Sequence, residues 1–181
     1  MKIKGFITNL GKYNEGELIG KWIDFPISEE ELNTVLKEIG CKYYDEETEE
    51  FYNSTYEEYF FSDWDSELVF GEYESIDEVN EIAETVNAFS SWEEETFLAA
   101  CELWGSSEVL ENGIDSYNLY ADIQSDYALG YYYAVESGCY DLDKMGSLAN
   151  YIDYEAFGRD IRFESEGGFT SYGWLEKYYE V

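Results

Sequence analysis

The chain reads YYDEETEEFYNSTYEEYFFSDWD over residues 43–65, where carboxylates and aromatic rings follow one another in short runs without a basic residue. The same composition continues to Asp143, so that residues 43–143 hold 28 Asp and Glu and not one Lys or Arg. Such a stretch cannot neutralise itself through internal salt bridges. We therefore expect it to present a continuous negative field to solvent or to a partner.

The composition of the whole chain predicts a folded protein. Its 181 residues carry a formal net charge of −32, which alone would favour disorder through self-repulsion. Hydrophobic residues make up 45% of the chain and aromatic residues 19%, however, whereas disordered acidic chains are poor in aromatics. The sequence indicates an aromatic-rich interior beneath an acidic surface.

The N-terminal residues predict a β-β-α start. Residues 2–9 and 18–25 have the composition of two strands, joined by a loop rich in Gly and Asn. Ser28 with Glu31 forms a capping box, and the amphipathic helix that follows is expected to end at Gly40.

Two aromatic segments follow, residues 51–56 and 58–64, and both have the composition of strands. We expect them to pair with the first two strands, with aromatic rings turned inward and carboxylates outward. The alternative is an irregular acidic loop.

The middle of the chain predicts three short helices. Ser75 with Glu78 and Ser91 with Glu94 are read as capping boxes, and residues 107–112 can form one more short helix. Several carboxylates of these helices stand three or four residues apart, where like charges repel.

The C-terminal part predicts further strands and helices. These are a strand at 117–123, helices at 126–136 and 147–157, and strands at 161–164 and 169–181. Gly158 would end the second helix, and Gly167-Gly168 would join the last two strands. The expected fold is α+β, with three small domains in series at 1–74, 75–113 and 114–181.

The residue types argue against an enzyme, a cofactor or a metal centre. The chain has no His, which removes the commonest general base and metal ligand. Cys41, Cys101 and Cys139 are too scattered for a zinc site and predict buried thiols in a reducing compartment. Residues 141–146 resemble the opening of a calcium loop, but Met145 stands where an oxygen ligand belongs. A carboxylate-dependent hydrolase remains an alternative, although no organised acid pair supports it.

The N-terminus has no apolar segment of signal-peptide length, and no run approaches 18 apolar residues. We expect a cytoplasmic protein that an anionic membrane would repel. The acidic surface has two further readings. It either serves solubility, as in salt-adapted proteins, or offers a basic DNA-binding groove a field like that of DNA, whose phosphates supply most of its affinity for proteins.

Two segments resemble the ArdA antirestriction proteins. The first is Asn9-Leu10-Gly11-Lys12-Tyr13-Asn14-Glu15-Gly16-Glu17-Leu18-Ile19-Gly20, continued by Trp22 and Phe25-Pro26-Ile27. The second is Leu148-Ala149-Asn150-Tyr151-Ile152-Asp153-Tyr154-Glu155-Ala156-Phe157-Gly158-Arg159-Asp160-Ile161, which is similar to the antirestriction motif of that family.

The resemblance implies an elongated, curved string of three domains, shaped and charged like bent B-form DNA. It implies a noncatalytic inhibitor that occupies the DNA-binding groove of type I restriction-modification enzymes, in the methyltransferase core of specificity and modification subunits. It also implies a homodimer joined through the C-terminal domain, neither nucleic acid nor membrane as a partner, and a role on mobile genetic elements. The alternative is an acidic interaction module for another basic DNA-binding protein or nuclease.

The candidate phosphate-mimicking carboxylates lie in the first two expected domains. They are Asp45, Glu46, Glu47, Glu49, Glu50, Glu57, Glu58, Asp63, Asp65, Asp77, Glu78, Glu81, Glu84, Glu93, Glu94 and Glu95. The candidate dimer interface is the antirestriction-like motif, made of Tyr151, Ile152, Asp153, Tyr154, Glu155, Ala156, Phe157, Gly158, Arg159, Asp160 and Ile161.

Overall fold

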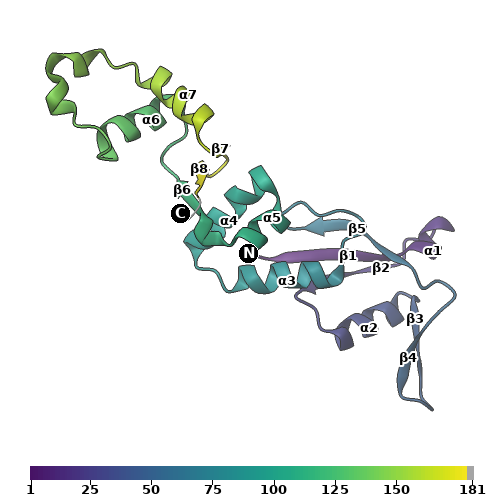
Figure 1. The fold of residues 1–181 in the computed structure, drawn as a ribbon. Coiled ribbons are helices and arrows are strands. Elements are labelled where there is room, and N and C mark those ends of the chain that lie inside the picture. Colours follow the sequence, from purple (N-terminus) through teal and green to yellow (C-terminus); the bar gives the residue numbers. More distant parts are fainter. Residues whose placement is uncertain (179–181) are drawn as a thin grey trace. The chain divides into compact units, whose positions relative to one another are not determined.

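The computed structural model describes residues 1–178 and divides the chain into two compact units. Unit 1 is Met1–Phe89 and unit 2 is Ser90–Val181. Helices and small antiparallel sheets occur in both units, which confirms the α+β class (Figure 1). The three domains with boundaries near residues 74 and 113 remain a prediction.

Unit 1 is built around a three-stranded antiparallel sheet of order β2-β1-β5. The strands are β1 (Ile3–Asn9), β2 (Gly20–Phe25) and β5 (Tyr59–Asp65). The first two strands are thus confirmed, and the second aromatic segment joins their sheet as predicted by pairing with β1. The loop between β1 and β2 contains a short helix, α1 (Leu10–Asn14).

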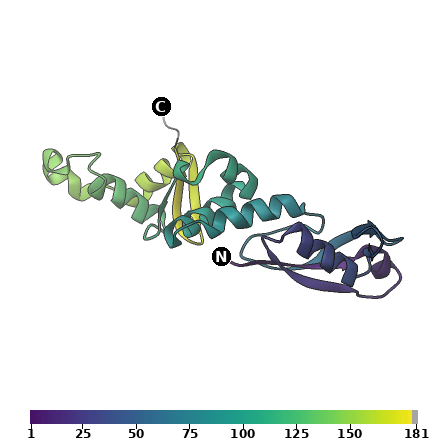
Figure 2. The same ribbon diagram turned by 90° about the horizontal axis from the view of Figure 1, so that it is seen from below.

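Helix α2 (Glu29–Glu38) lies against one face of this sheet (Figures 1 and 2). Its predicted capping box is present, with Ser28 and Glu31 each bonding the other's backbone N–H. Val35 and Leu36 are buried in the core of unit 1. Gly40 follows the helix with φ of 81°, a conformation that Gly adopts without strain.

The first aromatic segment does not join the sheet, and that prediction was wrong. Strands β3 (Lys42–Asp45) and β4 (Glu50–Asn53) pair only with each other as a separate hairpin. The cause is the tight acidic turn between them, where the Asp45 side chain accepts hydrogen bonds from the backbone of Glu47 and Thr48. The chain reverses at once, and β5 takes the free side of β1.

Helix α3 (Ile76–Asn87) buries Val79, Ile82, Ala83 and Val86. The predicted capping box at its start is wrong, because the Ser75 side chain accepts no capping hydrogen bond. Another residue joins the helix to the rest of unit 1 instead: Asn80 accepts from the backbone N–H of Ile27 at 2.8 Å and donates to its carbonyl at 3.0 Å.

Unit 2 begins with α4 (Ser91–Trp104) and α5 (Ser106–Asn112), and α5 confirms the predicted short helix. The capping box of α4 lies one residue earlier than expected, at Ser90 and Glu93. Two successive serines, each with a Glu three residues on, offer two equivalent starts. The observed start accompanies burial of Phe97 and its neighbours within unit 2.

A second antiparallel sheet, of order β6-β8-β7, forms the other layer of unit 2 beside α4 (Figure 2). After the turn η1 (Ile114–Ser116) come β6 (Tyr117–Tyr120) and, at the end of the chain, β7 (Gly167–Thr170) and β8 (Gly173–Lys177). The expected strand at 169–181 is instead the end of β7, a turn and β8, so Gly167-Gly168 lies inside a strand. Residues 179–181 of that prediction lie outside the described part.

The helix predicted at 126–136 is confirmed as α6 (Asp126–Tyr131) followed by the π-helical turn η2 (Tyr132–Glu136). The next two predictions are wrong. In place of a helix at 147–157 and a strand at 161–164, the chain forms the 3-10 segment η3 (Leu142–Tyr151) and helix α7 (Tyr154–Glu164).

The error came from Gly158, which lies in the middle of α7 and does not end a helix. A Cβ atom there would stand 1.8 Å from the carbonyl oxygen of Asp126, and one at Gly130 would stand 1.9 Å from that of Tyr154. Glycine is required at both positions because the backbones of α6 and α7 touch where they cross.

Candidate partner-binding surface

Helix α3 carries four of the predicted carboxylates on its exposed side, as its periodicity predicts. Asp77, Glu78, Glu81 and Glu84 are exposed, while the opposite side of the helix is buried. Residues three or four apart on a helix have Cβ atoms about 5–6 Å from each other, so this face is a closely spaced row of negative charge.

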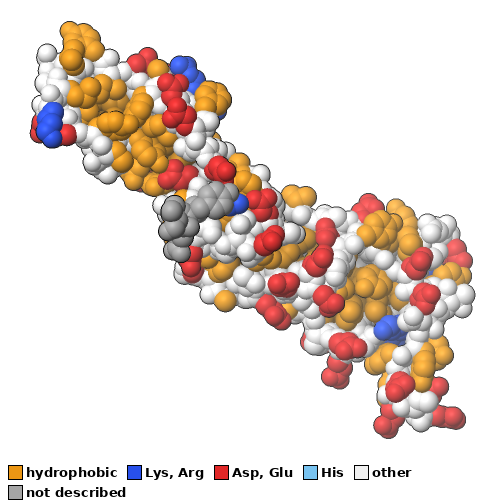
Figure 3. Space-filling model, in the orientation of Figure 1, with side chains coloured by type: hydrophobic (Ala, Val, Ile, Leu, Met, Phe, Trp, Pro, Cys, Tyr) orange, Lys and Arg blue, Asp and Glu red, His pale blue; other side chains and the backbone are white. Residues whose placement is uncertain are grey.

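The turn of the β3–β4 hairpin holds five more predicted carboxylates. Asp45 uses its side chain to hold the turn, accepting from the Glu47 and Thr48 backbone at 2.8 and 3.2 Å. Glu49 has φ of 58°, a left-handed conformation that non-Gly residues rarely adopt. The turn leaves Glu46, Glu47, Glu49 and Glu50 exposed at the tip, where Figure 3 shows acidic side chains gathered.

The remaining predicted carboxylates of unit 1, Glu57, Glu58, Asp63 and Asp65, are also exposed. Glu57 accepts a hydrogen bond from Asn53 at 2.7 Å.

In unit 2 the predicted carboxylates open helix α4. Glu95 is exposed, while Glu93 and Glu94 are half-buried. Glu93 has a structural task as the acid of the capping box, and the hydroxyl and backbone N–H of Ser90 lower the pKa of its carboxyl. It is therefore the member of the predicted set that is most clearly committed to the fold.

Several basic residues form ion pairs with acids outside the predicted set. Within the two units, Lys and Arg side chains form ion pairs with Glu15, Glu17, Asp24, Glu38, Glu108, Asp126 and Asp141. None of these acids belongs to the predicted set. Unit 1 contains 23 acidic and six basic residues, a formal net charge of −17, and the hairpin tip and the α3 face keep their charge.

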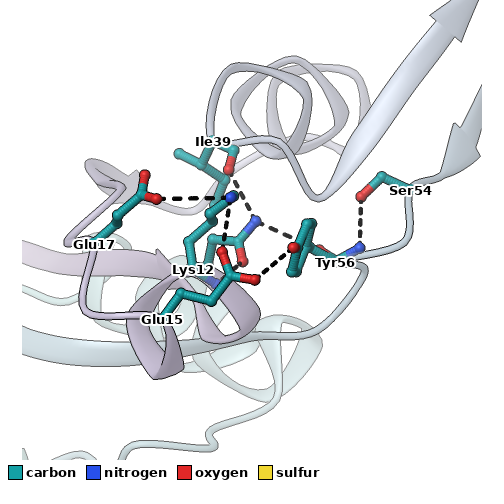
Figure 4. A network of polar contacts seen from close by, with 7 residues as sticks. Lys12, Glu15, Glu17, Ile39, Ser54 and Tyr56 are labelled. Carbon is teal, nitrogen blue, oxygen red and sulfur yellow. Dashed lines mark hydrogen bonds and ion pairs between the residues drawn. The ribbon is translucent and has the colours of Figure 1, made fainter.

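Several residues of the N-terminal motif have structural roles, and sequence reasoning missed that of Asn9. Its side chain is fully buried, accepts from the Lys12 backbone at 2.9 Å as the N-cap of α1, and donates to the carbonyls of Ile39 and Tyr56 (Figure 4). A single amide thus joins α1, the end of α2 and the loop before β5. An Asn as the last residue of a strand, directly before a Gly-containing loop, was the available signal.

The same motif places a lysine on an aromatic ring (Figure 4). The Nζ atom of Lys12 lies 4.6 Å from the Tyr56 ring centre and 2.9 Å from Glu15, which in turn accepts from the Tyr56 hydroxyl at 2.6 Å. These two partners lower the pKa of the Glu15 carboxyl, with the tyrosine contributing most. A Cβ at Gly11 would stand 2.2 Å from the Tyr56 ring, so glycine makes room for it.

The C-terminal motif spans the end of η3 and most of α7. Asp153 caps α7 by accepting from the Ala156 backbone at 3.0 Å, and Tyr154 packs edge-on against Tyr127 and Tyr131 of α6. Gly158 is buried at the helix crossing, while Tyr151 is 84% exposed. The motif therefore combines internal packing with an exposed apolar side chain.

The other members of the C-terminal motif divide in the same way. Asp153, Glu155, Arg159 and Asp160 are exposed, whereas Ile152, Ala156, Phe157 and Ile161 are half-buried. Just beyond the motif, Arg162 forms two hydrogen bonds with Asp126, at 2.8 and 3.2 Å, which join α7 to α6.

Hydrophobic side chains gather on the part of unit 2 formed by α6, η2, η3 and α7 (Figure 3). Large exposed members are Tyr127, Tyr131, Val135, Tyr140, Met145, Leu148, Tyr151 and Phe163. Among them opens an apolar hollow of about 180 Å³, lined by Ala134, Tyr140, Leu142, Met145, Ile152 and Phe157. We call this surface the apolar face; such exposed patches mark interaction sites.

Within residues 1–178, no group of three or more Cys, Asp and Glu side chains is arranged to hold a metal ion. In the segment that resembles a calcium loop, Asp141 forms an ion pair with Lys144 at 2.7 Å. No helix in the described part of the chain is both long and apolar enough to cross a membrane.

The fold and these surfaces define an acidic α+β protein with exposed carboxylate rows and an apolar face. Comparison with protein families gives a match to the antirestriction protein (ArdA) family over residues 5–176. The chain therefore belongs to the ArdA family of antirestriction proteins, which are inhibitors of restriction-modification enzymes and not enzymes themselves. No curated protein matches the chain.

Proposed function

We propose that this protein is a DNA mimic that occupies the DNA-binding groove of a type I restriction-modification enzyme and thereby blocks DNA binding. The target is the methyltransferase core of specificity and modification subunits, and the carboxylates of the hairpin tip, α3 and the start of α4 take the places of phosphates. One observation carries the proposal: within the described residues, the ion pairs of Lys and Arg side chains involve other acids, so the carboxylates of the hairpin tip and of α3 keep their charge.

The physical basis is the electrostatic part of DNA binding. A groove that binds DNA neutralises phosphates with Lys and Arg, and this interaction needs no particular base. Carboxylates about 5–6 Å apart on α3 offer such a groove a comparable density of negative charge. Because the field is shared by many groups, a single substitution should weaken inhibition only about two- to fivefold, as expected for one exposed charge pair.

We further propose that the apolar face joins two copies into a longer decoy, with the Tyr151–Ile161 motif at or near the interface. Its exposed rings would be covered by association, which favours burial of apolar area. Three of the four basic residues of unit 2, Lys144, Arg159 and Arg162, lie on η3 and α7. They reduce the repulsion that two acidic copies would otherwise meet at this face.

The test is a titration of the protein into a type I methyltransferase core that is already bound to a fluorescent DNA duplex, at two salt concentrations. Near-stoichiometric displacement that weakens with salt is expected, because the interaction is between charges. Failure to displace DNA from several such enzymes, with the protein shown to be folded, would refute the mimic.

Matched variants distinguish the effect of the position of a charge from the effect of the total charge of the protein. The pair Glu81→Gln and Glu84→Gln removes two unneutralised charges of α3, whereas Asp24→Asn and Glu38→Gln remove two charges that Lys4 and Lys21 already neutralise. We expect the α3 pair to weaken displacement more. Equal effects would show that net charge alone matters, and complete loss of displacement from one Glu→Gln change would contradict a shared field.

A second candidate is an acidic module for another basic DNA-binding protein or nuclease, favoured by the same exposed carboxylates. Displacement of DNA from an unrelated basic nuclease at the same protein concentration would support it over a target restricted to type I enzymes.

A further inference from the structure

The β3–β4 hairpin of unit 1 has two unequal sides. Neighbouring residues on a strand point to opposite sides, and the register pairs Tyr43 with Tyr52 and Tyr44 with Phe51. The side with Tyr44 faces α2, because Lys37 of that helix lies 5.4 Å from the Tyr44 ring centre. The side with Tyr43 and Tyr52 therefore faces away from α2.

This second side presents two stacked rings to solvent. Tyr43 is 51% exposed and Tyr52 37% exposed, with ring centres 5.8 Å apart and ring planes inclined by 27°. We call it the tyrosine face. In Figure 1 the hairpin that carries it extends away from the sheet of unit 1.

Carboxylates border the tyrosine face on the same side of the hairpin. Asp45 and Glu50 are cross-strand partners two residues beyond the rings, and Glu50 accepts a hydrogen bond from the Tyr52 hydroxyl at 3.0 Å. The acidic tip, with Glu46, Glu47 and Glu49, follows directly. Flat aromatic surface beside negative charge is the chemistry that recognises a guanidinium group, which stacks on rings and pairs with carboxylates.

We propose that the tyrosine face binds an arginine side chain in the DNA-binding groove of the target enzyme, an inference that rests on the proposed function. Charge complementarity favours an arginine of the enzyme over a second copy of this chain as the binding partner. A groove that binds phosphates is rich in Arg and Lys, and unit 1 with its net charge of −17 attracts it. A second copy carries −32 and is repelled by the acidic tip. The hairpin thus adds an aromatic anchor that DNA backbone itself does not offer.

The experiment uses the full chain in the DNA-displacement titration described above. The double variant Tyr43→Leu with Tyr52→Leu keeps apolar bulk but removes the ring faces, and should weaken displacement about 5- to 30-fold, as expected for two cation–ring contacts. The double variant Tyr43→Phe with Tyr52→Phe keeps the faces and should stay within about twofold of the wild type.

The salt dependence of DNA displacement distinguishes the contribution of the tyrosine rings from that of the carboxylates. The leucine variant keeps every charge, so the slope of log affinity against log salt should equal that of the wild type. The control variant Glu46→Gln with Glu47→Gln should reduce that slope. A leucine variant that displaces DNA as well as the wild type does would overturn the inference and leave the mimic intact, whereas a wild type that displaces nothing would overturn both.

A footprint on the wild-type protein does not depend on how the variants fold. Nitration by tetranitromethane, read by mass spectrometry, should modify Tyr43 and Tyr52 in the free protein and spare them in the complex. Equal nitration in both states would reject the tyrosine face as a contact. If the leucine variant instead changes self-association in sedimentation, the face belongs to a second copy and the arginine inference falls.

Discussion

Replacement of Gly158 by Ala should destabilise unit 2 strongly, although alanine is the better helix former. The added Cβ would stand 1.8 Å from the Asp126 carbonyl oxygen, and ordinary van der Waals contact begins at 3.4 Å, so α6 and α7 must separate by at least 1.6 Å. Backbone cannot rotate away as a flexible side chain can. The two hydrogen bonds between Arg162 and Asp126, at 2.8 and 3.2 Å, would be stretched by the same movement.

The magnitude follows from three contributions. Overpacking against backbone belongs at the upper end of the usual range, about 3 kcal/mol. Disturbing the partly exposed ion pair adds little, and the better helix propensity of Ala returns about 1 kcal/mol. The net loss is about 2–3 kcal/mol, which corresponds to a fall in Tm of about 10–20 °C for a unit of this size.

Thermal unfolding followed by near-UV circular dichroism measures this change, with Gly168→Ala as the matched control. A Cβ at Gly168 meets only the Leu103 side chain, at 3.2 Å, and that side chain is partly exposed and can move. We expect the control to stay within about 3 °C of the wild type, since surface-near substitutions cost little. A Gly158→Ala protein that unfolds at the wild-type temperature would refute the close crossing of α6 and α7.

Three further predictions concern other contacts. Asn9→Ala should cost about 2–4 kcal/mol in urea unfolding, because it removes a helix cap and leaves buried carbonyls unpaired, and a loss below about 1 kcal/mol would contradict the network. Cys139 is exposed, so the prediction of three buried thiols was wrong for this residue. Burial raises the pKa of the Cys101 thiol to about 12, so at pH 8 a disulfide reagent should modify Cys139 first, and equal rates would contradict the burial of Cys101. Arg162 lowers the pKa of Asp126, so the pair stabilises the fold above the unfolded pKa of the acid and this stability is lost as pH falls through the folded pKa. The Tm gap between wild type and Asp126→Asn should accordingly shrink from pH 7 to pH 3, whereas a constant gap would show that the ion pair contributes nothing.

The local features of the fold could be predicted from the sequence. Helices α2 and α3 follow from apolar spacing, and α2 also from a capping box, because both signals lie within a few residues of each other. The start of α4 was displaced by one residue, since Ser90 and Ser91 offer the same signal twice. Pairing between strands that are distant in the sequence was harder to predict. The composition of residues 51–56 suits a strand of the three-stranded sheet or of a separate hairpin, and the turn at Asp45 decides between these two arrangements.

The helix at the C-terminal motif was predicted at the wrong residues because glycine occurs both at helix ends and at close helix crossings. A glycine after an apolar stripe is typical of a helix end, yet Gly158 is needed inside α7 for the crossing with Gly130. The partner glycine lies 28 positions earlier in the sequence, and only the packed structure connects the two.

The candidate site was predicted in part. The exposure of the α3 carboxylates follows from helical periodicity. That their charge is not neutralised follows from the absence of Lys and Arg in this stretch of the sequence. The stacking of Tyr43 on Tyr52 required the register of the hairpin, which composition does not supply. The role of Asn9 was hidden for another reason, because a buried amide resembles an ordinary loop residue until its partners are known.

The Asn9 network has a consequence for how such proteins diverge. Its amide, like the glycines at the helix crossing, has no substitute of the same geometry, whereas a surface Glu can be replaced by Asp or moved to a neighbouring exposed position at little cost to folding. Under the proposed function, substitutions on the surface would change the charge pattern, and with it the enzyme that is inhibited, without altering the fold. Common ancestry would then be visible in the buried residues, whereas the choice of target would depend on exposed residues that vary easily.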